Sequence, residues 1–543
     1  MNDFVKTNTM DAGVNGAMTE NGAVSYSTIG TTLLDQFGKA GAFRGRSINE
    51  VWNDQLKLWA EDPEMALKFP FYLRMITRQT NVMGKGKTEK VQKGQGARDE
   101  AFKRLLWVAK YHPVEFYRNL WLLPIIGSWK DLWVLLSFEG ADEYLKKEEF
   151  FKVIAEGIGD ADNKDLVKKY LPRIRSNSKC KTEWAKKTNT LAKEFANRVG
   201  WDYKEYRFFK TTGRAHKFQT YICQGLYSKI EWGHIPGKAL LNLVTGKFLD
   251  RHNLTEDYIK WLEEQPVAKF NGYPFELGAK VGWNHEISLA QKITIDKQFK
   301  NLIETAKKDG TPMNGNVLCA LDTSGSMASP ISFDTNISAY DVCVSLGVYF
   351  SELNQGAFHN VVAMFDDTSE LLTLKGDSFC DKLMQIRRAR TAWGSTNFQS
   401  IIDMLVLTRK MHPEIALEDY PETILVVSDM QFNPTDSWGH KGNVIAEQSN
   451  YEAAMSKLRM VFPEEYVKKV KIIWWFCTGR HTADFPSTMD DAGTYVISGY
   501  DGAIVSAILG GEVKVNEKGE VIQPTMQDIV NAALNQEVLS LVS

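Results

Sequence analysis

The chain has 543 residues with a net charge of -2, and 43% of them are hydrophobic and 24% charged. This length exceeds what one hydrophobic core supports, so two or three domains are expected. The composition is ordinary for a soluble globular protein, and the absence of any run of about 18 apolar residues argues against a transmembrane helix and a membrane partner.

The six cysteines and the N-terminus bear on the compartment. No CxxC pair occurs and most of the cysteines lie inside apolar runs, which argues against a disulfide framework and a zinc site. The first 22 residues are polar and lack the apolar core of a signal peptide. We therefore expect a cytoplasmic protein, in the host cytoplasm if the source is viral.

The first half of the chain has a helical pattern. Residues 1–26 carry no periodic signal and are predicted to form a flexible N-terminal arm. A capping box of Ser47 and Glu50 then opens a helix that carries apolar residues at every third or fourth position. Helix pairs recur at roughly 35 to 40 residues without strand patterns between them, which predicts an all-α, HEAT-like solenoid over residues 27–306.

Basic residues gather in two parts of this helical region. Residues 84–96 contain four glycines and four lysines and are predicted to form an exposed loop. Residues 164–217 contain 16 Lys and Arg against 5 Asp and Glu, an excess expected of a polyanion-binding surface. The candidate RNA-binding residues are Lys85, Lys87, Lys90, Lys93, Arg173, Arg175, Lys179, Lys181, Lys186, Lys187 and Lys193.

Aromatic residues are interleaved with the second basic cluster, namely Trp184, Trp201, Tyr203, Tyr206 and Phe208. Aromatic rings can stack on unpaired bases, which favours RNA, although many of these rings are also expected in the core. Trp184, Leu191 and Phe195 have the spacing of an inward-facing stripe. For any single lysine, a solvated helix face remains the alternative interpretation.

A linker at residues 307–316 separates this region from alternating strands and helices over residues 317–510, the pattern of a doubly wound parallel sheet. Strands are predicted at the apolar runs that begin near residues 317, 360, 424, 472 and 495. Helices are predicted at about 338–354, 378–389, 397–411, 451–462 and 500–509. A short hairpin and a terminal helix are expected over residues 511–543.

The most informative stretch ends the first of these strands. Asp322, Ser324 and Ser326 follow the apolar run 317–321, and their spacing of two lets their oxygens point at one place. In an open α/β sheet this carboxyl edge is where ligands bind. Hard oxygen ligands suit Mg²⁺ above all, with Mn²⁺ or Ca²⁺ as alternatives.

Two further loops follow in order, at Thr396 and at Asp429. Together with Asp322, Ser324 and Ser326, these residues resemble the metal-ion-dependent adhesion site of a von Willebrand factor A domain. The resemblance implies that all five hold one metal ion and that an acidic residue of a protein partner completes its coordination. Turn and cap positions are the alternative role for these residues.

Most of the chain resembles the Ro family of RNA-binding proteins and their plant, bacterial and viral relatives, which join a TROVE-type helical-repeat module to a von Willebrand factor A domain. Besides the metal motif, the resemblance rests on residues 59–63, 66–68, 84–86, 98–99, 106–109, 112–113, 127–132, 169–172, 393–399 and 427–432. It implies a toroid of helical repeats that binds single-stranded ends and structured non-coding RNA through a basic rim and channel. The chain departs from the family by inserting residues 87–97.

The sequence favours binding over catalysis. It contains no GxSxG elbow, no P-loop and no HExxH motif, so no enzyme is predicted. We expect a non-catalytic, monomeric protein that binds non-coding or single-stranded RNA through the helical half and a protein partner through the metal. The alternatives are a protein-interaction scaffold and a structural component of a larger, possibly viral, particle with no RNA role.

Overall fold

The computed structural model describes residues 16–81, 87–212, 217–282, 287–308, 316–332, 335–389, 394–435, 448–479, 484–500, 508, 514–515, 521–522 and 524–543. By its internal contacts the chain divides into two compact units. The α/β unit comprises residues 1–45 and 262–533, and the helical unit comprises residues 46–261 and 534–543. The backbone therefore passes from one unit to the other three times.

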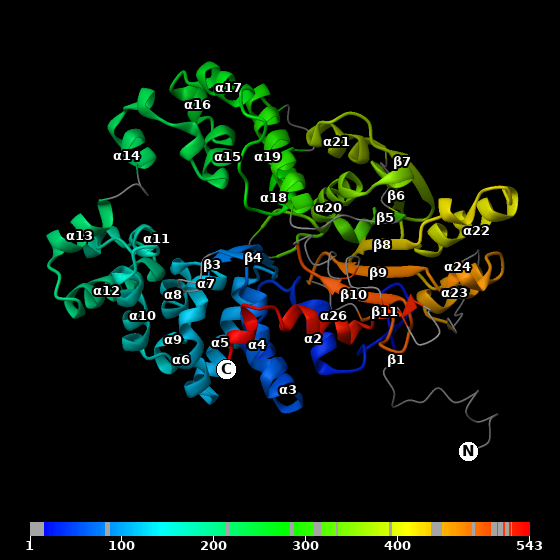
Figure 1. Cartoon of the computed structure of the whole chain (residues 1–543), viewed down its shortest axis with the longest axis horizontal. Coiled ribbons are helices and arrows are strands. Elements are labelled where there is room, and N and C mark those ends of the chain that lie inside the picture. The colour runs from blue at the N-terminus through cyan, green and yellow to red at the C-terminus, as the bar shows by residue number, and fades with distance from the viewer. Residues whose placement is uncertain are drawn as a thin grey trace. The chain divides into compact units, whose positions relative to one another are not determined.

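A six-stranded mixed sheet forms the centre of the α/β unit (Figure 1). Its strands are β5 (Val317–Asp322), β6 (Val361–Phe365), β7 (Ser369–Thr373), β8 (Thr423–Ser428), β9 (Lys471–Phe476) and β10 (Thr494–Ser498), in the spatial order β10-β9-β8-β5-β6-β7. All neighbours are parallel except β6 and β7. The five strands predicted from apolar runs are present, and β7 is an additional edge strand.

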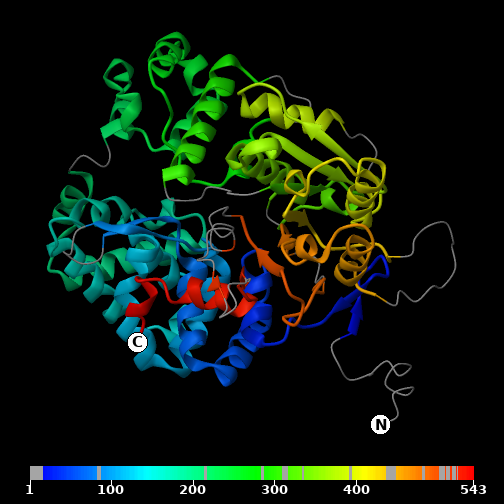
Figure 2. The same cartoon turned by 45° about the vertical axis from the view of Figure 1, so that its right-hand side comes forward.

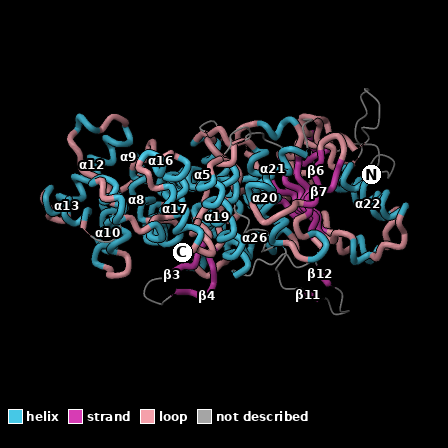
Figure 3. The backbone as a smooth tube through the Cα atoms, turned by 90° about the horizontal axis from the view of Figure 1, so that it is seen from above, coloured by secondary structure: helices cyan, strands magenta, loops and turns pink. Residues whose placement is uncertain are grey.

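Both faces of the sheet are covered, which explains why its central strands are continuous apolar runs. On β9, Trp474 packs against Phe398 on one face, and its neighbour Trp475 packs against Phe350 on the other. Side chains of adjacent strand residues point to opposite faces, so two consecutive buried tryptophans require two helical layers. Figure 3 shows the strands lying between helices.

The helices predicted at about 338–354, 378–389, 397–411 and 451–462 and the terminal helix are present in this unit, which also contains helices that were not predicted. The α-helices that the structure describes in this unit are α2 (Thr32–Ala40), α18 (Pro274–Gly278), α19 (Leu289–Lys308), α20 (Ala339–Leu353), α21 (Phe379–Ala389), α22 (Gln399–Met411), α23 (Asn450–Arg459), α24 (Glu464–Val467) and α26 (Met526–Leu534). Most of the helix predicted at 500–509 lies outside the described residues.

The division into units differs from the predicted domain boundary at residues 306–317. Residues 262–308 pack on the α/β unit, where α18 and α19 form a further layer over α20 and α21 (Figure 2). Buried Arg387 on α21 holds this layer, because it bonds Asp341 of α20 at 3.0 Å and the carbonyl oxygen of Val281. Helical periodicity alone could not show on which unit α18 and α19 pack. Most of the predicted linker, residues 309–315, lies outside the described residues.

Part of the predicted flexible arm is ordered. Residues 16–26 form a hairpin of β1 (Gly16–Met18) and β2 (Val24–Tyr26), while residues 1–15 lie outside the described part of the chain. Tyr26 exchanges main-chain hydrogen bonds with Phe485 at 2.8 and 2.7 Å, and α2 packs on β10. The partners of this segment are distant in sequence, so a search for local periodicity could not find them.

The helical unit consists of short helices in which several successive pairs pack together. They are α3 (Ile48–Glu61), α4 (Pro63–Arg74), α5 (Arg98–Tyr111), α6 (Pro113–Asn119), α7 (Leu123–Ile126), α8 (Trp129–Leu136), α9 (Ala141–Tyr144), α10 (Lys147–Gly159), α11 (Lys164–Tyr170), α12 (Glu183–Arg198), α13 (Tyr203–Thr211), α14 (Lys217–Gln224), α15 (Gly237–Thr245), α16 (Phe248–Arg251) and α17 (Thr255–Glu263). The capping box predicted at Ser47 is present.

Two segments of this unit differ from prediction. The predicted exposed loop contains β4 (Lys87–Gln92), which pairs with β3 (Arg78–Asn81). Gln92, the last residue of β4, and Gln95 are buried. At the C-terminus, β11 (Lys514–Val515), β12 (Val521–Ile522) and α26 match the expected hairpin and helix. Residues 534–543 instead belong to the helical unit, where Asn119 bonds both main-chain groups of Ser543 at 2.7 and 3.0 Å.

Candidate metal site and basic surface

The candidate metal residues lie where the strand order of the sheet reverses. β5 and β8 are neighbours, but the chain continues from β5 to β6 on one side and from β8 to β9 on the other. The connections therefore diverge beyond the carboxyl ends of β5 and β8, which is the switch point at which doubly wound sheets generally bind ligands. Asp322 ends β5 and Asp429 directly follows β8, so both carboxylates lie at this edge.

The first loop turns tightly around Asp322. The main-chain N–H of Ser324 donates to Asp322 Oδ1 at 2.9 Å, and the hydroxyl oxygens of Ser324 and Ser326 are 3.1 Å apart. Asp322 and Ser324 are buried, whereas Ser326 is partly exposed. The structure therefore brings the three motif residues together with Ser326 nearest to solvent.

Main-chain hydrogen bonds tie the other two loops to the first. Gly325 N donates to Gly394 O at 3.0 Å, which joins the first loop to the loop of Thr396. Asn433 N donates to Thr396 O at 2.8 Å, which joins that loop to the segment after Asp429. Thr396 and Asp429 are each 1% exposed. The three predicted loops thus form one connected edge.

Burial and mutual repulsion dominate the electrostatics of this edge. Burial raises the pKa of the Asp322 carboxyl above its usual value, and the negative charge of Asp429 raises it further, against the hydrogen bonds from Ser324 and Ser428. Two buried carboxylates that repel each other favour a shared cation, because the cation offsets the repulsion.

The donor set fits a hard divalent cation. It consists of carboxylate and hydroxyl oxygens only, which are the ligands that Mg²⁺ and Ca²⁺ prefer. Among the described residues, no three His, Cys, Asp or Glu side chains are placed so that they could hold a metal ion together. The described residues therefore show no metal site built from three thiolate or imidazole ligands. Asp322 and Asp429 would supply the charge and the hydroxyl groups would supply neutral oxygens.

Two contributors to this edge escaped the sequence analysis. Ser428 donates its hydroxyl to Asp322 Oδ2 at 2.5 Å and accepts from Met430 N at 2.9 Å. After β6, Asp367 accepts from Ser395 N at 3.0 Å and so positions the loop that carries Thr396. The available signal was a polar residue within two positions of the end of an apolar run, a pattern similar to the one that singled out Asp322.

The candidate RNA-binding residues fall into two groups in the structure. Lys85 lies outside the described residues, and the structure describes only the backbone of Lys87 and Lys90, in β4. Lys93 follows that strand, and its main chain bonds the side chain of Gln536 at 2.8 and 2.7 Å. The predicted contribution of this first lysine cluster to RNA binding remains a prediction.

The second group is best represented by the basic segment, residues 171–181, which lies between α11 and α12. Tyr206 donates its hydroxyl to Pro172 O at 2.7 Å, and the Asn189 amide bonds both main-chain groups of Arg175 at 2.7 and 3.1 Å. Tyr206 and Asn189 are buried, so the backbone of the basic segment is held in place by side chains of the core. Its exposed cations, none of which forms an ion pair with a described residue, are Arg173, Arg175, Lys179 and Lys181.

The lysines of α12 are less available. Lys187 pairs with Asp142 at 2.7 Å and donates to Phe138 O at 3.2 Å, and Lys186 pairs with Glu183 at 2.6 Å. Lys193 is exposed. The positive charges of Lys186 and Lys187 are partly neutralised within the protein, so these two residues are less suited to contact phosphates.

The aromatic residues divide between core and surface. Tyr206 is buried and Trp201 is half-buried, whereas Tyr203 and Phe208 are 53% and 71% exposed on α13. Trp184 is 52% exposed, so its predicted place in the inward stripe of α12 is wrong, although Leu191 and Phe195 are buried. Trp184 lies in the first turn of α12, where little of the unit covers it.

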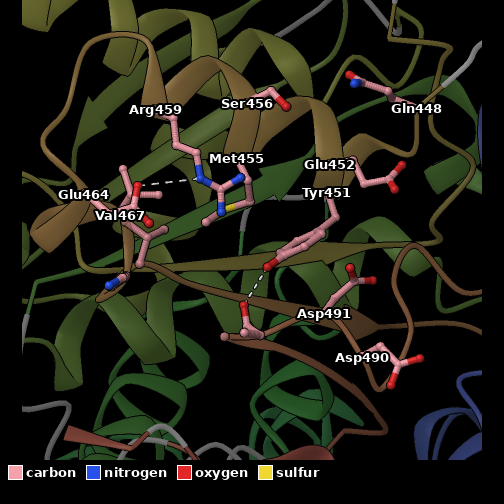
Figure 4. Close-up of a pocket in the computed structure, with 14 residues that line it drawn as sticks. Gln448, Tyr451, Glu452, Met455, Ser456, Arg459, Glu464, Val467, Asp490 and Asp491 are labelled. Atoms are coloured by element: carbon pink, nitrogen blue, oxygen red, sulfur yellow. Dashed lines mark hydrogen bonds and ion pairs between the residues drawn. The ribbon is translucent and has the colours of Figure 1, made fainter. Parts of the chain in front are cut away.

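A separate surface cavity of about 470 Å³ lies between α23, α24 and the loop before β10 (Figure 4). It is at the amino ends of β9 and β10, opposite to the edge of Asp322. Several of its polar groups already bond one another: Tyr451 donates to Ala492 O at 2.5 Å, and Arg459 pairs with Glu464 at 3.8 Å. We therefore assign these groups to stabilising the fold.

Two family descriptions match the chain, each over less than half of its length. Residues 316–539 match a domain of unknown function, DUF7788, and residues 19–220 match another domain of unknown function, DUF2828. The first match spans the whole six-stranded sheet. The second begins in the N-terminal hairpin and continues into the helical unit.

The chain is similar to an uncharacterized protein of Acanthamoeba polyphaga mimivirus, with 24% identity over 539 residues that cover 92% of this chain and 85% of the viral protein. A structure comparison returned the crystal structure of the Deinococcus radiodurans RO (RSR) protein, with 14% identity, a TM-score of 0.39, and coverage of 82% of this chain and 88% of that chain. Among the described residues, no helix is long and apolar enough to cross a membrane.

Proposed function

We propose that this chain is a non-catalytic binding protein with two binding surfaces. A von Willebrand factor A-like domain captures an acidic residue of a protein partner through a bound Mg²⁺ ion. A HEAT-like helical region binds non-coding or single-stranded RNA through its basic segment. The two surfaces lie on separately packed units, so an adaptor that connects RNA with a protein fits this organisation.

The arrangement of the candidate metal residues at the edge of the sheet is the observation that supports the proposed metal site. Two buried carboxylates and two neighbouring hydroxyl groups meet at the switch point of a doubly wound sheet whose edge strand β7 is antiparallel. A site with few charged ligands keeps a strong attraction for one more carboxylate, so capture of a partner's acidic residue suits it better than activation of water.

Calorimetric titration with MgCl₂ tests the metal site. We expect weak binding, because only Asp322 and Asp429 bring charge, and loss of binding by more than about a hundredfold in Asp322→Ala. Asp419→Ala, which removes an exposed carboxylate from the same unit, is the matched control. A folded wild-type protein that binds no Mg²⁺ at millimolar concentration would contradict the proposal.

The basic segment carries the second part. Four exposed cations lie on a stretch of backbone that buried Tyr206 and Asn189 hold in place, so they are arranged before any ligand binds. A fixed set of cations loses little conformational freedom on binding phosphates. Exposed rings of Tyr203 and Phe208 on the nearby α13 supply surfaces on which unpaired bases can stack.

Changing Arg173, Arg175, Lys179 and Lys181 together to Gln tests this surface. Each phosphate contact with single-stranded RNA contributes about 0.7 to the salt dependence of binding, so we expect the slope to fall by about 3 if all four make such contacts. A variant with Lys57, Lys130, Lys152 and Lys229 changed to Gln loses the same charge from exposed positions of the same unit. Gel-shift titrations at several salt concentrations would count against RNA binding if both variants behaved alike.

The second candidate function is a scaffold or structural component of a particle, without an RNA role. The similarity to a mimiviral protein over nearly the whole chain is the observation that favours it. The ratio of absorbance at 260 and 280 nm of the purified protein separates the two candidates. Co-purifying RNA that high salt removes supports RNA binding, whereas a nucleic-acid-free protein that assembles with itself supports the structural role.

A further inference from the structure

The N-terminal hairpin, residues 16–26, is bonded to the third loop of the candidate metal site. Thr19 Oγ1 donates to Phe432 O at 2.7 Å, and Asn21 Nδ2 donates to Gln431 O at 2.5 Å. The main-chain N–H of Glu20 donates to Gln431 Oε1 at 2.8 Å. Two consecutive loop residues are thus held by the turn of a hairpin that is more than 400 residues away in sequence.

Gln431 connects this hairpin to a candidate metal ligand. Its main-chain N–H donates to Asp429 Oδ1 at 3.2 Å, and its side chain, which is 4% exposed, accepts from Glu20. The peptide that orients the Asp429 carboxylate therefore belongs to the residue that the hairpin holds. A shift of Gln431 would turn the Asp429 oxygens away from the edge.

The loop needs such support because its backbone is unfavourable. Met430, between Asp429 and Gln431, has a φ angle of +64°, in the left-handed region that residues with a side chain rarely adopt. A residue persists in this conformation only where its surroundings determine it. Ser428, at the end of β8, supports the loop by accepting a hydrogen bond from Met430 N, and the hairpin supports it through Gln431 and Phe432.

We infer that the N-terminal hairpin positions Asp429 through Gln431 and so controls the affinity of the metal site. With the hairpin docked, the Asp429 carboxylate is oriented for the cation; with the hairpin released, affinity falls. This inference rests on the metal site proposed above. Because coupling between two sites is reciprocal, metal binding also strengthens docking of the hairpin.

The double variant Thr19→Val with Asn21→Ala removes two of the side-chain bonds to the loop. Loss of partners that orient metal ligands costs at least about tenfold in metal affinity, so we expect calorimetric titration with MgCl₂ to show a drop of about tenfold. The matched control is Met18→Ser, because Met18 lies in the same hairpin, is 58% exposed and makes no side-chain bond to the loop. The control should bind Mg²⁺ within twofold of the wild type.

Amide hydrogen exchange supplies a readout that does not depend on the metal. In EDTA, exchange at residues 430–433 should be at least about fivefold faster in the double variant than in Met18→Ser, because the loop loses its outer support. In the wild type, Mg²⁺ should slow exchange within the hairpin, an effect that a purely structural hairpin would not show. A wild type that binds no Mg²⁺ contradicts the metal site, whereas exchange at 430–433 that does not respond to the double variant overturns the inference.

Discussion

Buried Asp131 of the helical unit and buried Asp322 of the α/β unit have their negative charges balanced in opposite ways. In the helical unit, buried Asp131 pairs with Arg74 and with Arg98, so its charge is balanced inside the protein. In the α/β unit, buried Asp322 accepts hydrogen bonds from Ser324 and Ser428 and forms no ion pair with a described residue. The charge of Asp131 is neutralised within the fold by arginines, whereas Asp322 is held only by neutral donors and is left for the cation that we propose.

The positive charges show the complementary difference. In the helical unit the basic segment leaves four cations exposed, while Lys187 on the adjacent α12 pairs with Asp142. In the α/β unit the buried cations Arg387 and Lys382 form ion pairs with Asp341 and Glu352, respectively. The comparison teaches that a count of charges locates a candidate surface, but only the pairing of each charge shows whether it can bind a ligand.

The largest expected effect comes from removing the charge of Asp131. Asp131→Asn keeps an acceptor for the capping bond from Ser128 N, at 2.7 Å in the structure, but removes the negative charge that is paired with buried Arg74. Breaking a buried ion pair in this way costs about 3–5 kcal/mol of stability. Urea denaturation should show the loss, with the exposed Asp142→Asn variant changing stability by less than about 1 kcal/mol. Equal effects of the two variants would show that the buried pairing of Asp131 adds no stability beyond that of an exposed carboxylate.

A smaller loss is expected from truncating residues 535–543. Gln536 exchanges two bonds with the main chain of Lys93, and Val538 and Leu539 are buried in the helical unit. Losing these contacts should cost about 2–3 kcal/mol, since each fully buried aliphatic side chain contributes about 1.5–3 kcal/mol before the cost of ordering the chain is subtracted. Leu541→Ala, at a position that is 39% exposed, is the control. Hydrogen exchange should assign the destabilisation to α4 and α5; an equal increase in the sheet would contradict the division into units.

The smallest expected change in stability concerns buried Lys210 on α13, whose ammonium group is affected by the charge of Arg173 in the basic segment. Burial, and secondarily the positive charge of Arg173, lowers the pKa of Lys210 to about 8. Below this pH the folded state carries the cost of a buried charge; between about 8 and the ordinary value of 10.5 only the unfolded chain keeps the proton, so stability rises with pH. Lys210→Met should therefore stabilise the protein at pH 7 by about 1 kcal/mol, less than the pKa change implies because the ammonium group keeps some hydration. The extra stability of the Lys210→Met variant should shrink as pH rises toward 10. Extra stability that does not change with pH would show that it arises from packing and not from removal of the buried charge.

The sequence was most informative where the candidate metal residues lie at the ends of apolar strands. Asp322 and Asp429 could be placed at one edge because parallel strands share their carboxyl ends, and the structure brings their loops together. The edge strand β7 was missed because it has little buried surface, with only Ser369 and Leu372 half-buried. Periodicity identifies strands that are covered, and β7 is mostly open.

Long-range partners were beyond what the sequence could show. Nothing in residues 16–26 indicates a partner near residue 432, because the bonds depend on where the fold brings Thr19 and Asn21. The same reason applies to Lys187, whose neutralising partner Asp142 lies on another helix. Charge and hydropathy are properties of single residues, whereas pairing is a property of the folded chain.

The docking of residues 16–45 on the rest of the α/β unit also affects how the chain folds during synthesis. Gly41 N donates to Ser498 Oγ, a partner 457 residues later. At about 5–20 residues per second, a ribosome needs roughly 20 to 90 s to synthesise this interval. Until then Leu33, Leu34 and Phe37 of α2, which are buried in the finished protein, have no sheet to cover them. The nascent α2 segment is therefore suited to bind chaperones that recognise apolar segments. The α/β unit is completed late, after the helical stretch between residues 46 and 261 has been synthesised.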